Sequence, residues 1–218
     1  MTKLSPVTQQ IAEELLGDVA PLAEQIGSAE GLVALSDAVS QQFHRVTDLP
    51  SLRLFLGDYQ SRILIPLELP AIWRAYRHAS RYEIRELIEL DRQLVREPLL
   101  QSFATASQRV GKTQLKRLRP LRDQRLVRRY LCAVQAGEAH AWHTVVYGLI
   151  LSLYSLPPRQ GLLSYAQQTT RGFIRSASGH LQLSGAQCEE LLNEAEACFP
   201  EAVNKLLSSA AAPVSLIG

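Results

Sequence analysis

The chain has 218 residues, 46% of them hydrophobic, and a formal net charge of +2 at pH 7. This hydrophobic content excludes an intrinsically disordered chain, and the near balance of charge argues against a protein whose main ligand is nucleic acid. The three cysteines form no Cys-x-x-Cys pair, which indicates reduced thiols and favours a reducing compartment.

The sequence gives no sign of export or of membrane insertion. Its first residues are polar and amphipathic, without the apolar core of a signal peptide. The longest nearly uncharged run, residues 141–158, is interrupted by polar side chains and falls short of the ~20 apolar residues that a membrane span needs. We therefore expect a cytoplasmic protein with no membrane contact.

Helical patterns follow one another along the chain, because apolar residues recur at intervals of three and four. The expected helices lie in residues 5–17, 32–43, 50–64, 72–77, 81–96, 99–110, 123–134, 138–155, 159–176, 187–192 and 200–207. Hairpin turns and two-residue alternation are scarce, so strands are not expected. The sequence predicts an all-α protein, a single-domain bundle of about ten helices over residues 1–207, followed by a flexible tail at 208–218.

Several residues are expected to set helix boundaries. Pro66 and Pro70 punctuate the start of one helix, and Gly111 is expected to end another. Pro157 and Pro158 separate an apolar helix from a polar one. Residues 184–187, Ser-Gly-Ala-Gln, fit a capping box at the start of the next helix.

His140 and His143 are the weak candidates for a metal site. Three residues apart, they would share one face of a helix, and nearby Glu138 could supply a further ligand. The alternative is a structural role, in which both histidines cap or hydrogen-bond the start of the central helix. We favour that alternative, and assign no metal site.

No catalytic motif is present, so we expect no enzymatic activity. The nearest approach to a phosphate-binding loop, residues 110–113, lacks the upstream glycine. Nucleophile-elbow and zinc-protease motifs are also missing from the sequence.

Residues 109–129 hold nine basic residues opposed only by Asp123. Such a stretch could be a solvated connection, a surface for an acidic protein partner, or a nucleic-acid site, in that order of preference. Aromatic residues for base stacking are missing from it, so we expect no nucleic-acid binding.

The order of segments from residue 19 to residue 207 resembles the urease accessory protein F (UreF) family, of which the chain would be a divergent member. The resemblance is carried by Gly31-Leu32, Val46-Thr47-Asp48, Ser107, Gly111, Leu115, His143, Gly148, Leu156-Pro157, Leu162-Leu163, Tyr165, Leu183, Gly185 and Leu191-Leu192. The family's Pro-Leu-Gly-Gln turn is replaced here by residues 182–185, Gln-Leu-Ser-Gly.

The resemblance implies an all-helical, dimeric scaffold that assists nickel insertion into apo-urease without catalysis. Its implied partners are a second accessory protein, called D or H, a GTPase, called G, and apo-urease. The complex would pass nickel on, and this subunit would hold no permanent cofactor. The partner-binding residues expected here are Arg171, Arg175, His180, Gln182 and Gly185.

The altered contact positions leave a second reading open, in which the chain is a helical adaptor or regulatory protein without urease partners. A third reading is a small metal-binding protein or enzyme that uses the two histidines.

Overall fold

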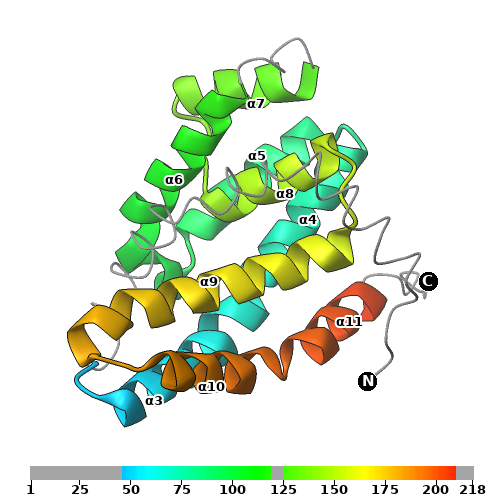
Figure 1. Ribbon diagram of the computed structural model, residues 1–218. Coiled ribbons are helices and arrows are strands. Elements are labelled where there is room, and N and C mark those ends of the chain that lie inside the picture. Colours follow the sequence, from blue (N-terminus) through cyan, green and yellow to red (C-terminus); the bar gives the residue numbers. More distant parts are fainter. Residues whose placement is uncertain (1–45, 119–124, 210–218) are drawn as a thin grey trace.

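The computed structural model of the chain describes residues 46–118 and 125–209, and every regular element in these ranges is helical (Figure 1). In chain order the elements are α3 (Leu49–Tyr59), the π-helix η1 (Gln60–Glu68), α4 (Leu69–Ser80), α5 (Ile84–Val95), the 3-10 helix η2 (Pro98–Phe103), α6 (Ala104–Arg117), α7 (Arg125–Gln135), α8 (His143–Leu153), α9 (Pro158–Leu181), α10 (Gly185–Glu196) and α11 (Phe199–Ser209). The all-α prediction is therefore confirmed.

The helices are arranged around α8 and α9 (Figure 1). α8 packs against α4 and α6, and α4 also contacts α5. α9 packs against α10, α11 and α3. Residues 141–150 are all buried, as expected for a helix that is apolar on every side.

The first described helix begins where its sequence signals predict. The side chain of Asp48 accepts a hydrogen bond from the backbone N–H of Ser51, 2.9 Å away, and the Ser51 hydroxyl completes a capping box. Pro50 occupies the first turn, where its missing N–H leaves no hydrogen bond unmade. These signals are local in the sequence, which is why the start of this helix was predictable.

Two glycines allow close backbone contact, one between α8 and α4 and the other between α6 and the segment before α8. A Cβ atom at Gly148 would lie 2.4 Å from the carbonyl oxygen of Ile72 on α4. A Cβ atom at Gly111 would lie 1.9 Å from the carbonyl oxygen of Ala141. The prediction that Gly111 ends a helix was wrong, because this glycine lies inside α6 and allows that helix to touch the segment before α8.

The prediction that Pro66 and Pro70 punctuate the start of a helix holds for Pro70, which lies in the first turn of α4, and is wrong for Pro66, which lies inside η1. The chain stays helical from Leu49 to Ser80 through α3, η1 and α4. η1 has the wider turns of a π-helix, in which the N–H of Leu69 bonds to the carbonyl of Leu64, five residues earlier. This winding accommodates Pro66, which has no N–H to donate.

The expected count of about ten helices is not matched over the described residues, partly because predicted helices merge into this longer rod. α9 runs to Leu181, past the predicted end at 176, and α11 runs to Ser209, two residues into the predicted tail. The helices expected within residues 5–43 and the rest of the tail, 210–218, lie outside the described residues.

None of the helices in the described ranges is both long and apolar enough to cross a membrane.

Candidate functional site

The two arginines predicted to bind a partner lie one turn apart on α9, and both are exposed. The guanidinium of Arg171 forms an ion pair with Glu196 of α10 at 3.5 Å, yet 57% of its side chain remains accessible. An exposed pair of this kind adds at most about 1 kcal/mol to stability. The ion pair therefore holds Arg171 where α9 packs against α10, and the guanidinium stays exposed.

The predicted contact turn is shorter than expected, because α9 includes His180 in its last turn. His180 follows Arg175 by five residues, a rotation of roughly 140° around a helix with 3.6 residues per turn. The structure therefore does not place His180 on the same face as Arg171 and Arg175.

The turn itself is built by two helix caps. Gln182 ends α9 in the left-handed conformation, with φ of 50°, and its N–H bonds to the carbonyl of Ser178. Ser184 then starts α10 with the predicted capping box, its hydroxyl accepting from the N–H of Gln187 at 3.3 Å. Gln182 and Gly185 are both exposed, so the turn can be reached by a partner.

The two histidines do not share a helix face, so that prediction was wrong. α8 begins at His143, and His140 lies in the segment before it, where Ala141 has a φ of 59°. Glu138 pairs instead with Arg92, at 3.7 Å. Over the described residues, no three His, Cys, Asp or Glu side chains gather in a way that could hold a metal ion.

Buried Asp91 of α5 explains the position of His140. Its carboxylate accepts hydrogen bonds from the backbone N–H of His140 at 2.5 Å and of Trp142 at 3.1 Å. It also accepts from the hydroxyl of Tyr130 on α7, at 2.6 Å. One carboxylate therefore joins α5, α7 and the segment that leads into α8.

His143 lies at the centre of a second buried polar group. Its Nδ1 is 2.7 Å from the Ser107 hydroxyl of α6, and its Nε2 is hydrogen-bonded to the Tyr165 hydroxyl of α9. Burial lowers the pKa of His143 to about 3, so the imidazole is neutral at physiological pH. His143 is therefore a buried, hydrogen-bonded residue where α8 meets α6 and α9.

The hydrogen bonds continue from Tyr165 to a buried carboxyl group. Tyr165 interacts with Glu68 of η1, and the hydroxyl of Tyr59 donates a hydrogen bond of 2.5 Å to the same carboxyl group. Burial raises the pKa of Glu68 to about 7, although the hydrogen bonds from both tyrosines act in the opposite direction. We call Ser107, His143, Tyr165, Glu68 and Tyr59 the core polar chain.

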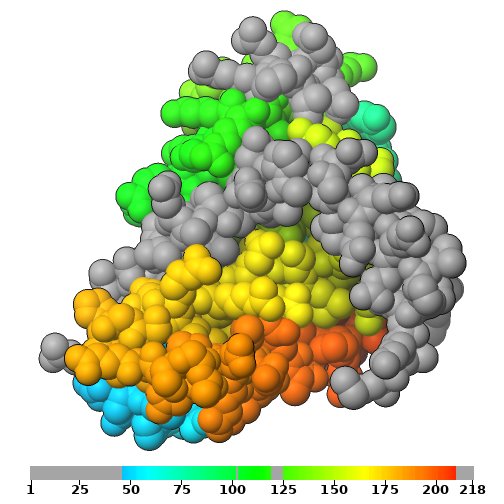
Figure 2. All heavy atoms as spheres, in the orientation of Figure 1, coloured from blue at the N-terminus to red at the C-terminus, as the bar shows by residue number. Residues whose placement is uncertain are grey.

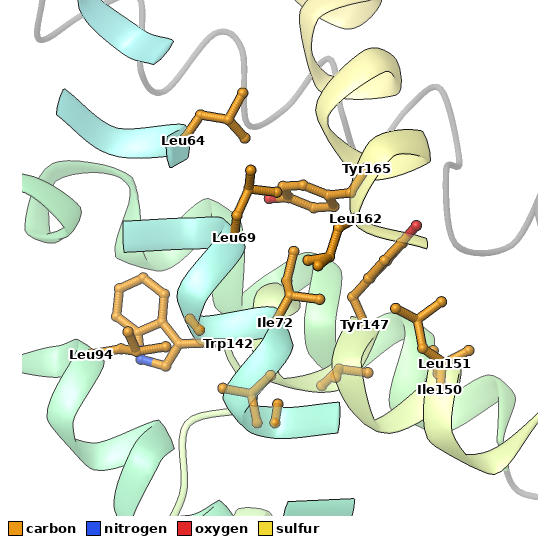
Figure 3. Packing of buried hydrophobic residues seen from close by; sticks show 14 of the residues in the cluster. Leu64, Leu69, Ile72, Leu94, Trp142, Tyr147, Ile150, Leu151, Leu162 and Tyr165 are labelled. Atoms are coloured by element: carbon orange, nitrogen blue, oxygen red, sulfur yellow. The ribbon is translucent and has the colours of Figure 1, made fainter. Parts of the chain in front are cut away.

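The core polar chain is enclosed by apolar side chains. In Figure 3 the ring of Tyr165 lies beside Leu69 and Leu162, and Tyr147 flanks it. The rings of Tyr147 and Tyr165 are 5.1 Å apart in an edge-to-face arrangement. Such a dry environment strengthens each hydrogen bond and penalises any that is lost.

The core polar chain uses a single set of proton positions when Glu68 is ionised. Both tyrosines then donate to the carboxylate, so Tyr165 must accept from Nε2–H of His143. Nδ1 is left as an acceptor for the Ser107 hydroxyl, which in turn accepts from the backbone N–H of His143. Each donor therefore has an acceptor, and five helical segments, α3, η1, α6, α8 and α9, are tied together.

Glu68 and Asp91 were missed in the sequence. Each is an acid at a position that the apolar pattern assigns to the core, since Glu68 stands between Leu67 and Leu69, and Asp91 follows Leu90. An acid at a core position is the signal that would have found them, because buried carboxylates need several donors.

A scan against protein-family models matches residues 46–196, more than half of the chain, to the model described as UreF. A search of curated proteins found no match.

Proposed function

We propose a function from a premise that this match establishes: the chain belongs to the UreF family, a family of urease accessory proteins and not of enzymes. The protein would act as a scaffold in urease maturation, by contact with other proteins. Its partners in this proposal are the second accessory protein (D or H), the GTPase (G) and apo-urease, and the scaffold is a homodimer. The family match is the observation that carries the proposal.

The α9–α10 seam is the contact surface that we assign to these partners. It offers exposed Arg171 and Arg175 on one helix face and the exposed cap residues Gln182 and Gly185. A Cβ atom at Gly185 would meet nothing within 4 Å, so packing within this chain does not require glycine there. Rigid helices hold these groups in fixed positions, which lowers the entropic cost of binding.

Nickel is the cargo of the complex in this proposal, and this subunit does not retain it. Calorimetric titration of the purified chain with Ni²⁺ tests this point. We expect no binding tighter than about millimolar, equivalent to roughly −4 kcal/mol. Micromolar binding would instead support a metal-binding role.

The test of the scaffold is assembly from purified components. We expect the full chain to co-elute with the second accessory protein and the GTPase in size-exclusion chromatography, and to raise urease activation when nickel is supplied. The double variant Arg171→Ala/Arg175→Ala should weaken assembly at least tenfold. Arg85→Ala/Arg96→Ala removes two exposed arginines of the α5 region and should leave assembly unchanged. Failure of the unaltered chain to assemble with any of these partners would remove the proposal and favour an adaptor without urease partners.

A further inference from the structure

The outer face of α6 carries a row of positive charge that forms no ion pair with residues 46–118 or 125–209. Arg109, Lys112 and Lys116 are exposed and follow one another at helical spacing on this helix. Together with Thr105, Gln108 and Thr113 they line a shallow hollow of about 330 Å³, which we call the α6 basic groove. In Figure 2 α6 forms an outer edge of the molecule, in green.

No acidic residue of the chain lies near these cations in sequence. Residues 98–122 contain neither Asp nor Glu. Among the ion pairs of the described residues, which use Arg53, His78, Arg81, Arg92 and Arg171, none involves the cations of the groove. A row of like charges at this spacing repels itself by a few tenths of a kcal/mol per pair. An external anion would relieve this repulsion.

The shape of the α6 basic groove favours a large anionic partner over a small anion. All six lining residues belong to one helix, so no second element closes over a bound ion. Thr105 and Lys116 are eleven positions apart, and at 1.5 Å per residue the groove extends for about 16 Å. A row of this length matches carboxylates spaced along another helix or an extended acidic segment.

The chemistry of the surroundings favours protein over nucleic acid. The described residues of α6 and α7 expose no aromatic side chain on which a base could stack, since Tyr130 is buried. The chain as a whole carries only +2, whereas nucleic-acid-binding domains concentrate a larger positive excess. Thr105 and Gln108, at the end of the row next to Arg109, offer donors suited to carboxylates, whereas the Thr113 hydroxyl already donates to the carbonyl of Arg109 at 2.9 Å.

We propose that the α6 basic groove is a docking surface for an acidic segment of a protein partner, distinct from the α9–α10 seam. The identification of that partner as a member of the urease maturation complex rests on the proposed function. The binding of an acidic polypeptide does not rest on it. Attraction between a basic row and an acidic segment would accelerate association and depend strongly on salt.

The first test measures binding of fluorescein-labelled poly-L-glutamate to the full chain by fluorescence anisotropy. The NaCl concentration is varied from about 50 to about 300 mM, because added salt increasingly screens the attraction between exposed charges. The variant Arg109→Glu/Lys112→Glu/Lys116→Glu should bind at least tenfold more weakly. A matched control, Arg85→Glu/Arg96→Glu/Lys205→Glu, changes the net charge equally at exposed positions elsewhere and should weaken binding less than threefold. Equal weakening by the two variants overturns the proposal, because binding would then follow net charge alone.

Two further arms complete the test. A fluorescein-labelled DNA duplex that binds the groove more tightly than poly-L-glutamate, at the same salt concentration, would overturn the proposal in favour of nucleic acid. Arg109→Gln/Lys112→Gln/Lys116→Gln removes charge without reversing it and should also lose at least fivefold in affinity, with an unchanged circular dichroism spectrum. A neutral variant that binds as tightly as the unaltered chain also contradicts the proposal.

Assembly with the accessory proteins then separates the groove from the scaffold function. If the unaltered chain assembles and the glutamate variant assembles at least tenfold more weakly, the groove contacts a member of that complex. If both assemble equally, the groove is not used there, and the proposed partner is wrong while the scaffold function stands. If neither assembles, the scaffold function fails, and binding of poly-L-glutamate still decides whether the groove takes acidic chains.

Discussion

The hydroxyl of Ser107 meets His143 twice, lying 2.7 Å from the imidazole Nδ1 and 3.3 Å from the backbone nitrogen. One small side chain of α6 thus serves both the ring and the first N–H of α8, which has no partner inside its own helix. Because the imidazole is neutral, the hydroxyl can donate to Nδ1 while it accepts from the N–H.

Removing that hydroxyl should destabilise the protein well beyond the value of one ordinary hydrogen bond. Ser107→Ala leaves two buried groups of His143 unpaired, and we expect a loss of about 1–3 kcal/mol in the free energy of unfolding, measured with urea. Ser61→Ala is the matched control, because this exposed hydroxyl donates only to the backbone carbonyls of Gly57 and Asp58, four and three residues earlier in the same helical run. The control should change stability by less than about 0.5 kcal/mol. Equal effects of the two changes would show that the Ser107 contact adds nothing in solution.

Glu68 should make stability depend on pH. Its folded pKa is about 7, against an ordinary value of 4.5, so between these values the folded state keeps a proton that the unfolded state releases. Its contribution is present below pH 4.5 and is lost as pH rises through about 7. The loss is on the order of 3 kcal/mol. His143 acts in the opposite sense, because its lowered folded pKa reduces stability as pH falls below its ordinary 6.5.

The variant Glu68→Gln isolates the first of these effects, since glutamine stays neutral at every pH. We expect its unfolding free energy, relative to the unaltered chain, to increase between pH 4.5 and about pH 7 and to level off above that, as measured by urea unfolding at several pH values. Glu86→Gln, an exposed change on α5, should show a difference that is flat over this range. A flat difference for Glu68→Gln as well would contradict the raised pKa.

Two glycines in helices should respond oppositely to alanine. Gly111→Ala places a Cβ atom 1.9 Å from a backbone oxygen of the neighbouring segment, so α6 must move, and we expect a loss of about 1–3 kcal/mol. Gly57 is an exposed residue of α3, and a Cβ atom there would meet nothing within 4 Å. Gly57→Ala should therefore stabilise the protein by up to about 1 kcal/mol, because alanine has the higher helix propensity. Thermal unfolding followed by circular dichroism gives the comparison, and similar melting temperatures for the two variants would argue against the close contact.

Gln182→Gly should stabilise the end of α9. Gln182 holds a φ of 50° and a ψ of 42°, a left-handed conformation that costs an L-residue about 1 kcal/mol and glycine much less. Glu189→Gly is the control, since glycine inside α10 should destabilise by about 1 kcal/mol. Denaturant unfolding measures both. A Gln182→Gly protein that is more stable but assembles poorly would assign a partner contact to the glutamine side chain.

The parts of the fold that could be predicted depend on neighbouring residues. Asp48 and Ser184 start helices through side chains that reach only three residues ahead, and such signals are visible in sequence. Gly111 looked like a helix end because its actual contact, the carbonyl of Ala141, is thirty positions away. Local patterns cannot distinguish a glycine that ends a helix from one that allows close packing.

The candidate site was predictable to a similar extent. The exposed arginines of α9 follow from its polar sequence, whereas the pairing of Arg171 with Glu196 joins two helices and has no local signal. The separation of His140 from His143 depends on Asp91, which lies on a different helix and binds the backbone between the two histidines. The helical face that the two would share exists only if α8 begins earlier than it does.

The winding of η1 has a consequence for angular register. In an α-helix each residue turns the chain by about 100°, so Tyr59 and Glu68, nine positions apart, would point in opposite directions. In π-type turns each residue rotates the chain by a smaller angle about the helix axis. The smaller rotation brings the Tyr59 hydroxyl and the Glu68 carboxyl group within hydrogen-bonding distance. A chain that straightened this segment into a regular helix would swing the acid away from Tyr59, so the phase of the helix determines where the charge lies.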